Sequence, residues 1–115
     1  MVASITTSGL QNLNNPVAAT FTGQWALATG TGDVITVSYP TPNTSLTDGL
    51  LLAFRASAAN LTTTPTFSPD GQLAAIIVKY NLAALAAGDI QGSGAECLVR
   101  YNLTSNVWVL LNPTF

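Results

Sequence analysis

Hydrophobic and polar residues alternate, with a period of two, in several short segments of the chain. In the clearest case Ile35, Val37 and Tyr39 alternate with the polar residues Thr36 and Ser38. This pattern is typical of a half-buried β-strand, because successive side chains of a strand point to opposite faces. We predict strands at 25–29, 33–39, 50–57, 74–80, 95–101 and 107–111, and the segment 17–21 is short and ambiguous.

The residue pattern of three of these segments allows more specific predictions. In 50–57 both faces are largely apolar, so that either both are buried or one meets another subunit. The strand 95–101 places Cys97, Val99 and Tyr101 on one side. The strand 107–111 places Trp108 and Leu110 on one side.

Turn residues separate the predicted strands. The polar connections 40–49 and 60–71 end in the turn pairs Asp48-Gly49 and Asp70-Gly71. Alanine and leucine in 82–87 favour a single helical turn that Gly88 ends. No longer stretch has the 3.6-residue apolar period of a helix. The pattern therefore predicts an all-β fold, a small antiparallel β-sandwich or barrel-like module.

The chain length of 115 residues corresponds to one domain. Residues 1–16 are polar and include Gly9 and Pro16, so we interpret them as an extended N-terminal arm or linker. Residues 17–115 are then a single β module.

Charge is scarce in this sequence. Charged residues make up 7% of the chain, against about 25% in an average soluble domain. A polar but uncharged surface repels other copies weakly and suits a protein buried in a fixed assembly; the alternative is a monomer with an unusual surface. The 3 basic residues are too few to neutralise a nucleic-acid backbone. The apolar runs are too short to span a membrane.

The residue types needed for catalysis are poorly represented. The chain has no histidine, which excludes Ser-His and Cys-His nucleophile pairs and the usual zinc ligands. Asp48, Asp70 and Asp89 each adjoin a glycine, where a carboxylate commonly bonds the local backbone. Cys97, the only cysteine, is expected to be a small buried hydrophobic residue. We therefore predict no enzymatic activity, no metal and no cofactor.

Aromatic side chains are the remaining candidates for binding, because their faces are apolar and their edges polar. We single out Trp25, Trp108 and Tyr101 as candidates for stacking on a glycan or for a subunit interface. The alternative is that they pack in the core of the domain.

From about Asp33 to Pro113, an ordered set of short motifs resembles repeat modules of the tail fibres and tail spikes of tailed bacteriophages. The most specific motifs are the run LAAGDI at 85–90 and the closing W-x-L-L-N-P at 108–113. The weaker ones are TDGL at 47–50, FRA at 54–56, Asn60, IVK at 77–79 and LV at 98–99. The chain departs from the pattern at 63–71, where the family usually has an asparagine-rich turn.

This resemblance implies a homotrimeric, β-rich structural protein of the virion without enzymatic activity. Its expected partners are two further copies of itself, other virion tail proteins and, where the module lies at a fibre tip, a glycan of the host surface. The expected location is the virion tail, after assembly in the host cytoplasm. The alternatives are a carbohydrate-binding receptor-recognition tip and a capsid decoration protein of the head-fibre type.

Overall fold

The computed structural model describes residues 24–113, and within that range the secondary structure is β-strand apart from one short 3-10 turn. The prediction of an all-β fold is confirmed. The arm predicted at 1–16 and the ambiguous segment 17–21 lie outside the described residues. The elements are β1 (Gln24–Gly30), β2 (Val34–Val37), β3 (Leu51–Arg55), β4 (Thr66–Pro69), β5 (Ala75–Lys79), the 3-10 turn η1 (Tyr80–Leu82), β6 (Ala83–Ala84), β7 (Glu96–Asn102) and β8 (Val107–Leu110).

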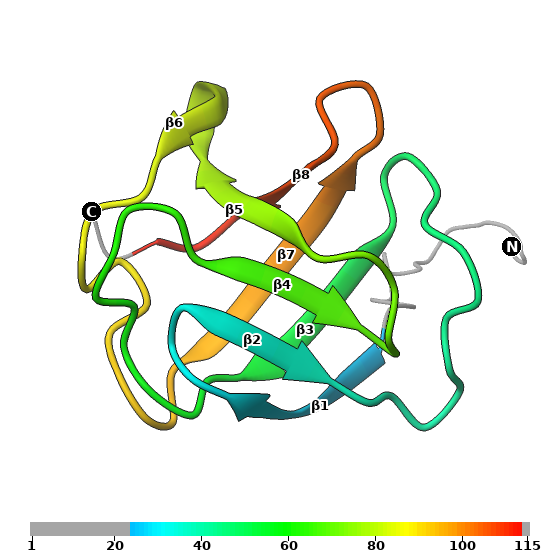
Figure 1. Ribbon diagram of the computed structural model, residues 1–115, viewed down its shortest axis with the longest axis horizontal. Helices are drawn as coiled ribbons and strands as arrows, with labels where there is room; N and C mark the ends of the chain where they lie inside the picture. The colour runs from blue at the N-terminus through cyan, green and yellow to red at the C-terminus, as the bar shows by residue number, and fades with distance from the viewer. Residues whose placement is uncertain (1–23, 114–115) are drawn as a thin grey trace, which may run out of the picture.

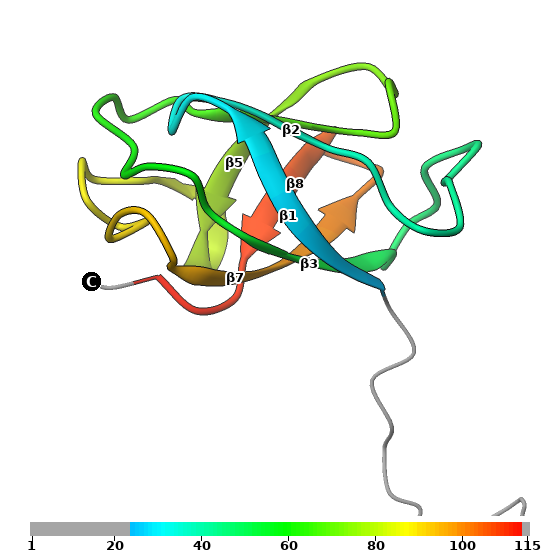
Figure 2. The same ribbon diagram turned by 90° about the horizontal axis from the view of Figure 1, so that it is seen from below.

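The sheet closes into a mixed 7-strand barrel. Its strands follow the order β4-β2-β1-β3-β7-β8-β5, and pairing of β4 with β5 completes the circle. The short strand β6 pairs with the end of β5 outside this circle. Figure 1 shows β2, β4 and β5 in front of β3, β7 and β8, and Figure 2 shows β1 running diagonally between β2 and β3.

The barrel-like shape is therefore confirmed, but the expectation of purely antiparallel strands is wrong. Three pairs are parallel, namely β1 with β3, β2 with β4 and β5 with β8. Alternation along one strand reports which side chains are buried and carries no information on the direction of the neighbouring strand. Parallel neighbours need a long crossover, and the connections between β2, β3 and β4 supply it.

The core lies inside the barrel and is built around aromatic rings. Phe54 stacks on Phe67 with the ring centroids 5.1 Å apart, and Trp108 meets Phe67 edge-on at 4.9 Å. Phe67 belongs to β4, which the sequence pattern did not predict because 60–71 reads as a polar connection. The predicted grouping of side chains on β7 and β8 is confirmed, and the structure shows that the sides carrying Cys97, Val99, Tyr101, Trp108 and Leu110 are the buried ones.

The predicted helical turn at 82–87 is wrong. The 3-10 turn comes earlier, at Tyr80–Leu82, and Ala83 and Ala84 pair with β5 as a strand. Helix propensity is overridden here because Leu85 is buried in the barrel core, which draws the chain back to the sheet.

The buried residues Asn60 and Asp89 and the partly buried Lys79 form a cluster of polar side chains, which we call the polar clasp. Asn60 accepts a hydrogen bond from the backbone N–H of Ile90 at 2.9 Å and donates to the carbonyl of Ala86 at 3.0 Å. Asp89 accepts from Lys79 Nζ at 2.9 Å and from the N–H of Ala86 at 2.8 Å. The clasp thereby fixes the 85–90 loop against β5 and the 60–65 connection.

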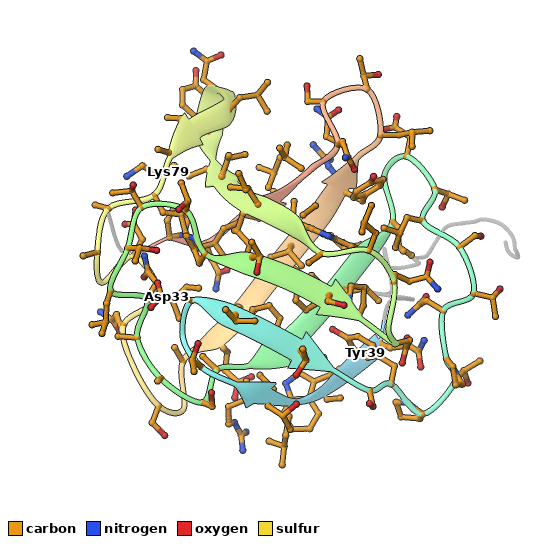
Figure 3. All side chains as sticks on the ribbon, viewed as in Figure 1. Asp33, Tyr39 and Lys79 are labelled. Carbon is orange, nitrogen blue, oxygen red and sulfur yellow. The ribbon has the colours of Figure 1, made fainter. Side chains whose placement is uncertain are left out.

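Two carboxylates also hold loops at the two ends of β2, where Figure 3 labels Asp33 and Tyr39. Asp33 accepts hydrogen bonds from the N–H groups of Leu61 and Thr62 at 3.0 and 2.9 Å. Asp70 accepts one from the N–H of Tyr39 at 2.8 Å. The local backbone role predicted for Asp89 is confirmed by its bond to Ala86. For Asp70 and Asp48 the prediction of a local role is wrong, because they accept from distant backbone, Asp48 from the N–H of Leu103 at 2.9 Å.

Candidate functional site

The structure separates the three aromatic residues that the sequence singled out. Trp108 is 0% exposed and Tyr101 is 5% exposed, with their ring centroids 5.0 Å apart in the core. Neither offers a surface to a glycan or to a second subunit, so core packing holds for both. The reason is the strand period: Tyr101 and Trp108 are cross-strand partners whose side chains both point into the barrel.

Trp25 is the exception. It lies on the outside of β1 and is 44% exposed. Its indole N–H donates a hydrogen bond to Glu96 Oε1 at 2.8 Å. Arg55 Nε donates to the other oxygen of the same carboxylate at 2.6 Å, and the Arg55 guanidinium carbon lies 5.0 Å from the centre of the Trp25 ring. We call these three residues the outer cluster.

The outer cluster is assembled by the register of three neighbouring strands. Trp25 comes from β1, Arg55 from β3 and Glu96 from β7. Arg55 pairs directly with Glu96 across β3 and β7. Trp25 pairs with Ala53, two residues before Arg55 on the same face of β3. The small side chain of Ala53 leaves room for the indole to reach toward β7.

The sequence analysis did not find Arg55 and Glu96 as site residues. Both are charged residues in mainly apolar strands, and this is the one feature of the sequence that could have marked them as site residues. Their pairing depends on β3 lying next to β7, and strand order is not visible in the sequence.

Electrostatics keep the outer cluster in one charge state. The hydrogen bond from the Trp25 indole, followed by that from Arg55, lowers the pKa of the Glu96 carboxyl below its ordinary value. Glu96 is therefore ionised at neutral pH and balances the positive charge of Arg55. The cluster presents the indole ring of Trp25 beside a donor, Arg55, and an acceptor, Glu96, whose charges cancel.

A second surface feature lies across the sheet, beside the η1 turn. A shallow, mostly apolar hollow of about 330 Å³ is bordered by Tyr80, Leu82, Val109 and Leu111, and the charged Arg100 also lines it. Tyr80 is 85% exposed, and Leu82 has a φ of 60°, a left-handed conformation that leucine rarely adopts. Figure 1 shows the β5–β6 hairpin projecting from the barrel at this point. We call this feature the hairpin groove.

The remaining reactive groups serve the fold. Among residues 24–113 there is no group of three His, Cys, Asp or Glu side chains able to hold a metal ion. Cys97 is buried, as predicted, and burial raises the pKa of its thiol to about 12. A thiol in that state is a poor nucleophile.

No helix within the described part of the chain is long and apolar enough to cross a membrane. Comparison with known proteins adds no relative: no protein-family model matches the sequence, and no curated protein is significantly similar to it.

Proposed function

We propose that this chain is a structural module of a bacteriophage tail fibre or tail spike, which assembles as a homotrimer in the virion tail and takes part in host attachment. The observation that carries the proposal is the position in the fold of the residues that carry the resemblance. The two most specific motifs place residues in the core and hold the 85–90 loop and the segment after β8, so that the resemblance concerns determinants of the architecture. The residues paired between β4 and β5, which close the barrel, lie outside these motifs.

The LAAGDI run supports this argument. Leu85 and Ile90, its first and last residues, are buried in the core. Gly88 has a φ of 84°, which an L side chain rarely adopts, and its N–H bonds the carbonyl of Asn60 at 3.0 Å. Asp89 belongs to the polar clasp. Each distinctive position of the run therefore has a physical role in holding the loop.

The closing W-x-L-L-N-P motif supports the argument in the same way. Trp108 and Leu110 fill the core. Asn112 accepts a hydrogen bond from the N–H of Leu98 at 2.9 Å and donates to the carbonyl of Glu96 at 2.7 Å, which continues the pairing with β7 beyond β8. A chain that shares these motifs is expected to have the same pairing of its last strand, and of the asparagine that follows it, with the preceding strand.

The outer surface supports self-assembly. Large apolar side chains of the hairpin groove stand exposed on a chain with few charges to keep copies apart. Among residues 24–113 the short strand β6 has a strand partner on one side, in β5, and its Ala83 and Ala84 are exposed. Open strand edges of this kind favour pairing with another chain. The hairpin groove is therefore our candidate for the trimer contact.

The proposal assigns the module no catalytic activity and no cofactor. In the described residues the carboxylates of Asp33, Asp48 and Asp70 are engaged by backbone N–H groups that hold loops. A glycosidase needs two carboxylates that face one cleft. Asp89 and Glu96 border one hollow, but Asp89 is bound by Lys79 and the N–H of Ala86, and Glu96 by Trp25 and Arg55.

The solution mass tests the assembly, by light scattering coupled to size exclusion. We expect three times the chain mass of 11.9 kDa. The double variant Leu82→Asp with Leu111→Asp should shift the mass to one chain, because burying two new carboxylates at an interface is unfavourable. Leu73→Asp, at an exposed position in the β4–β5 turn, is the matched control and should stay trimeric. A wild-type chain that is monomeric at every concentration would argue against the trimer.

The location is tested on phage particles by electron microscopy with a gold-labelled antibody raised against the purified chain. We expect label on the tail. Label confined to the capsid would replace the tail fibre proposal with that of a head decoration protein.

A further inference from the structure

We propose that the outer cluster of Trp25, Arg55 and Glu96 is a binding site for a neutral sugar ring, a hexopyranose of a surface glycan. This inference deepens the adhesive part of the proposed function and rests on it for its biological meaning. Its chemistry depends on the three side chains alone.

The indole is held in place before any ligand arrives. An exposed tryptophan on a sheet surface ordinarily samples several rotamers, and a ligand that stacks on it must offset the loss of that freedom. Here the bond from the indole N–H to Glu96 and the position of Arg55 over the ring fix its orientation. Arg55 covers one face of the ring, and 44% of the residue is still open to solvent, so that a ligand would have to use the part of the indole that Arg55 leaves uncovered.

The polar groups beside the ring suit sugar hydroxyls. Arg55 uses Nε for its bond to Glu96, and among the described residues its two terminal NH₂ groups donate no further hydrogen bond. Each Glu96 oxygen accepts one bond and keeps acceptor capacity for another. A sugar hydroxyl is both donor and acceptor, so neighbouring hydroxyls of one ring can bond Arg55 and Glu96 while the C–H face of the ring rests on the indole.

Charge decides which class of sugar fits. An acidic sugar could approach Arg55 only by bringing its carboxylate next to the ionised Glu96, on a chain whose net charge is −2. A phosphate would meet the same repulsion. A neutral hexopyranose avoids it and uses both members of the ion pair.

A neighbouring hollow gives the site room for more than one ring. Glu96 also borders a depression of about 230 Å³ whose lining includes the amide side chains of Gln91 and Asn112. Amides donate and accept hydrogen bonds, as hydroxyls do. A single ring on an open face binds weakly, with an expected Kd of about 1 mM. Three copies in one trimer would raise the effective affinity for a repeating glycan.

The experiment is an NMR titration of the ¹⁵N-labelled chain with the methyl glycosides of glucose, galactose and mannose. The two tryptophans give two indole N–H signals. We expect the Trp25 signal to shift with at least one glycoside while the buried Trp108 signal stays in place, as an internal control for the fold. No shift of the Trp25 signal with any of the three, well above about 1 mM, would overturn the inference.

Matched variants separate binding from stability. Arg55→Lys keeps the charge but loses the planar fork, and Glu96→Gln removes the anionic acceptor; each should weaken binding at least about tenfold, with the Trp108 signal unchanged. Leu73→Ala, away from the outer cluster, should bind as the wild type does. If Arg55→Lys and Glu96→Gln both bind like the wild type, the cluster merely holds β1 on the sheet, and the inference is wrong.

The mass measurement keeps this inference apart from the proposed function. If the chain is a trimer and its Trp25 signal does not shift with any glycoside, the structural role stands and the sugar site is wrong. If the chain is a monomer and its Trp25 signal shifts, the sugar site stands and the trimer is wrong.

Discussion

The sheet formed by β3, β7 and β8 and the loop held by the polar clasp are stabilised in different ways. The sheet buries apolar side chains such as Phe54, Val99 and Trp108 on its inner face. The loop is held by Asn60 and Asp89, two polar residues that are buried nearly as completely. Hydrophobic burial is non-directional and follows from a simple alternation of residue types. A buried polar group is stable only with its particular partners in place.

This difference in stabilisation determines where the fold tolerates change. In the sheet, a substitution that keeps the volume and the apolar character should cost little. In the clasp, even an isosteric substitution removes a donor or acceptor from partners that are largely shielded from solvent. The predictions below test this difference, beginning with the largest effect.

Trp108→Ala should have the largest effect, with a loss of about 3–5 kcal/mol in the free energy of unfolding, because it empties the centre of the aromatic core. Urea denaturation followed by circular dichroism measures it. Trp108→Phe should cost clearly less, since the indole N–H has no hydrogen-bond partner among the described residues and nothing polar is lost. Equal losses for the two variants would mean that this position depends on the indole itself rather than on volume.

Asp89→Ala should come next, with a loss of about 2–4 kcal/mol, because it leaves the Lys79 ammonium and the N–H of Ala86 without an acceptor. Asp89→Asn should lose less, since its amide oxygen can still accept from Ala86. The double variant Asp89→Ala with Lys79→Met should recover part of the loss, because no unpaired charge remains. If the double variant is as unstable as the sum of its single variants, the ion pair is not coupled.

Acid should weaken the loops at both ends of β2. Hydrogen bonding from Thr62 lowers the pKa of Asp33 below its ordinary value of 3.8. For Asp70, burial acts to raise the pKa, but hydrogen bonds from Asn43 and Tyr39 outweigh it, and the net shift is again downward. A carboxyl with a depressed pKa stabilises the fold fully above its unfolded value and loses that contribution as the pH falls through its folded value.

We therefore expect the melting temperature to fall as the pH drops below about 3.8, and Asp70→Asn to reduce this dependence. Thermal denaturation by circular dichroism from neutral pH to strongly acidic pH measures it. The same acid sensitivity in Asp70→Asn as in the wild type would assign the effect to other carboxyls.

Substitutions in the outer cluster should have the smallest effect on stability. Arg55 and Glu96 form an ion pair with about half of each side chain exposed, and such pairs contribute little. The denaturation midpoint of Glu96→Gln should lie close to that of the wild type, in the same urea experiment. A large loss of stability in Glu96→Gln would show that the outer cluster holds β1 on the sheet. The outer cluster would then depend on specific polar partners, as the polar clasp does.

The sequence predicted the parts of the fold that depend on alternation. Strands β1, β2, β3, β5, β7 and β8 lie where they were expected, with small differences at their ends. Strand β4 was missed because Phe67 is its only large apolar residue and proline flanks it on one side and ends it on the other. The parallel pairs were missed because pairing direction depends on the path of long connections.

The candidate site was harder to predict than the fold. Trp25, Tyr101 and Trp108 look alike in sequence, because each lies in an alternating strand. They differ in whether their face of the strand points into the barrel or to solvent, and the alternation alone does not show this. Trp25 is exposed because the small residues Ala26 and Ala28, on the opposite side of β1, pack against the core. Arg55 and Glu96 were out of reach, since they become neighbours only when β3 and β7 pair.

The parallel pairing of β1 with β3 also determines how the barrel bears mechanical load. The chain enters the barrel at Gln24, and the first half of β1 bonds β3 while its second half bonds β2. A pull on that end along the strand acts at right angles to the antiparallel bonds with β2 and obliquely to the slanted parallel bonds with β3. Tension applied to β1 at Gln24 would therefore load the hydrogen bonds to β3 and to β2 in shear.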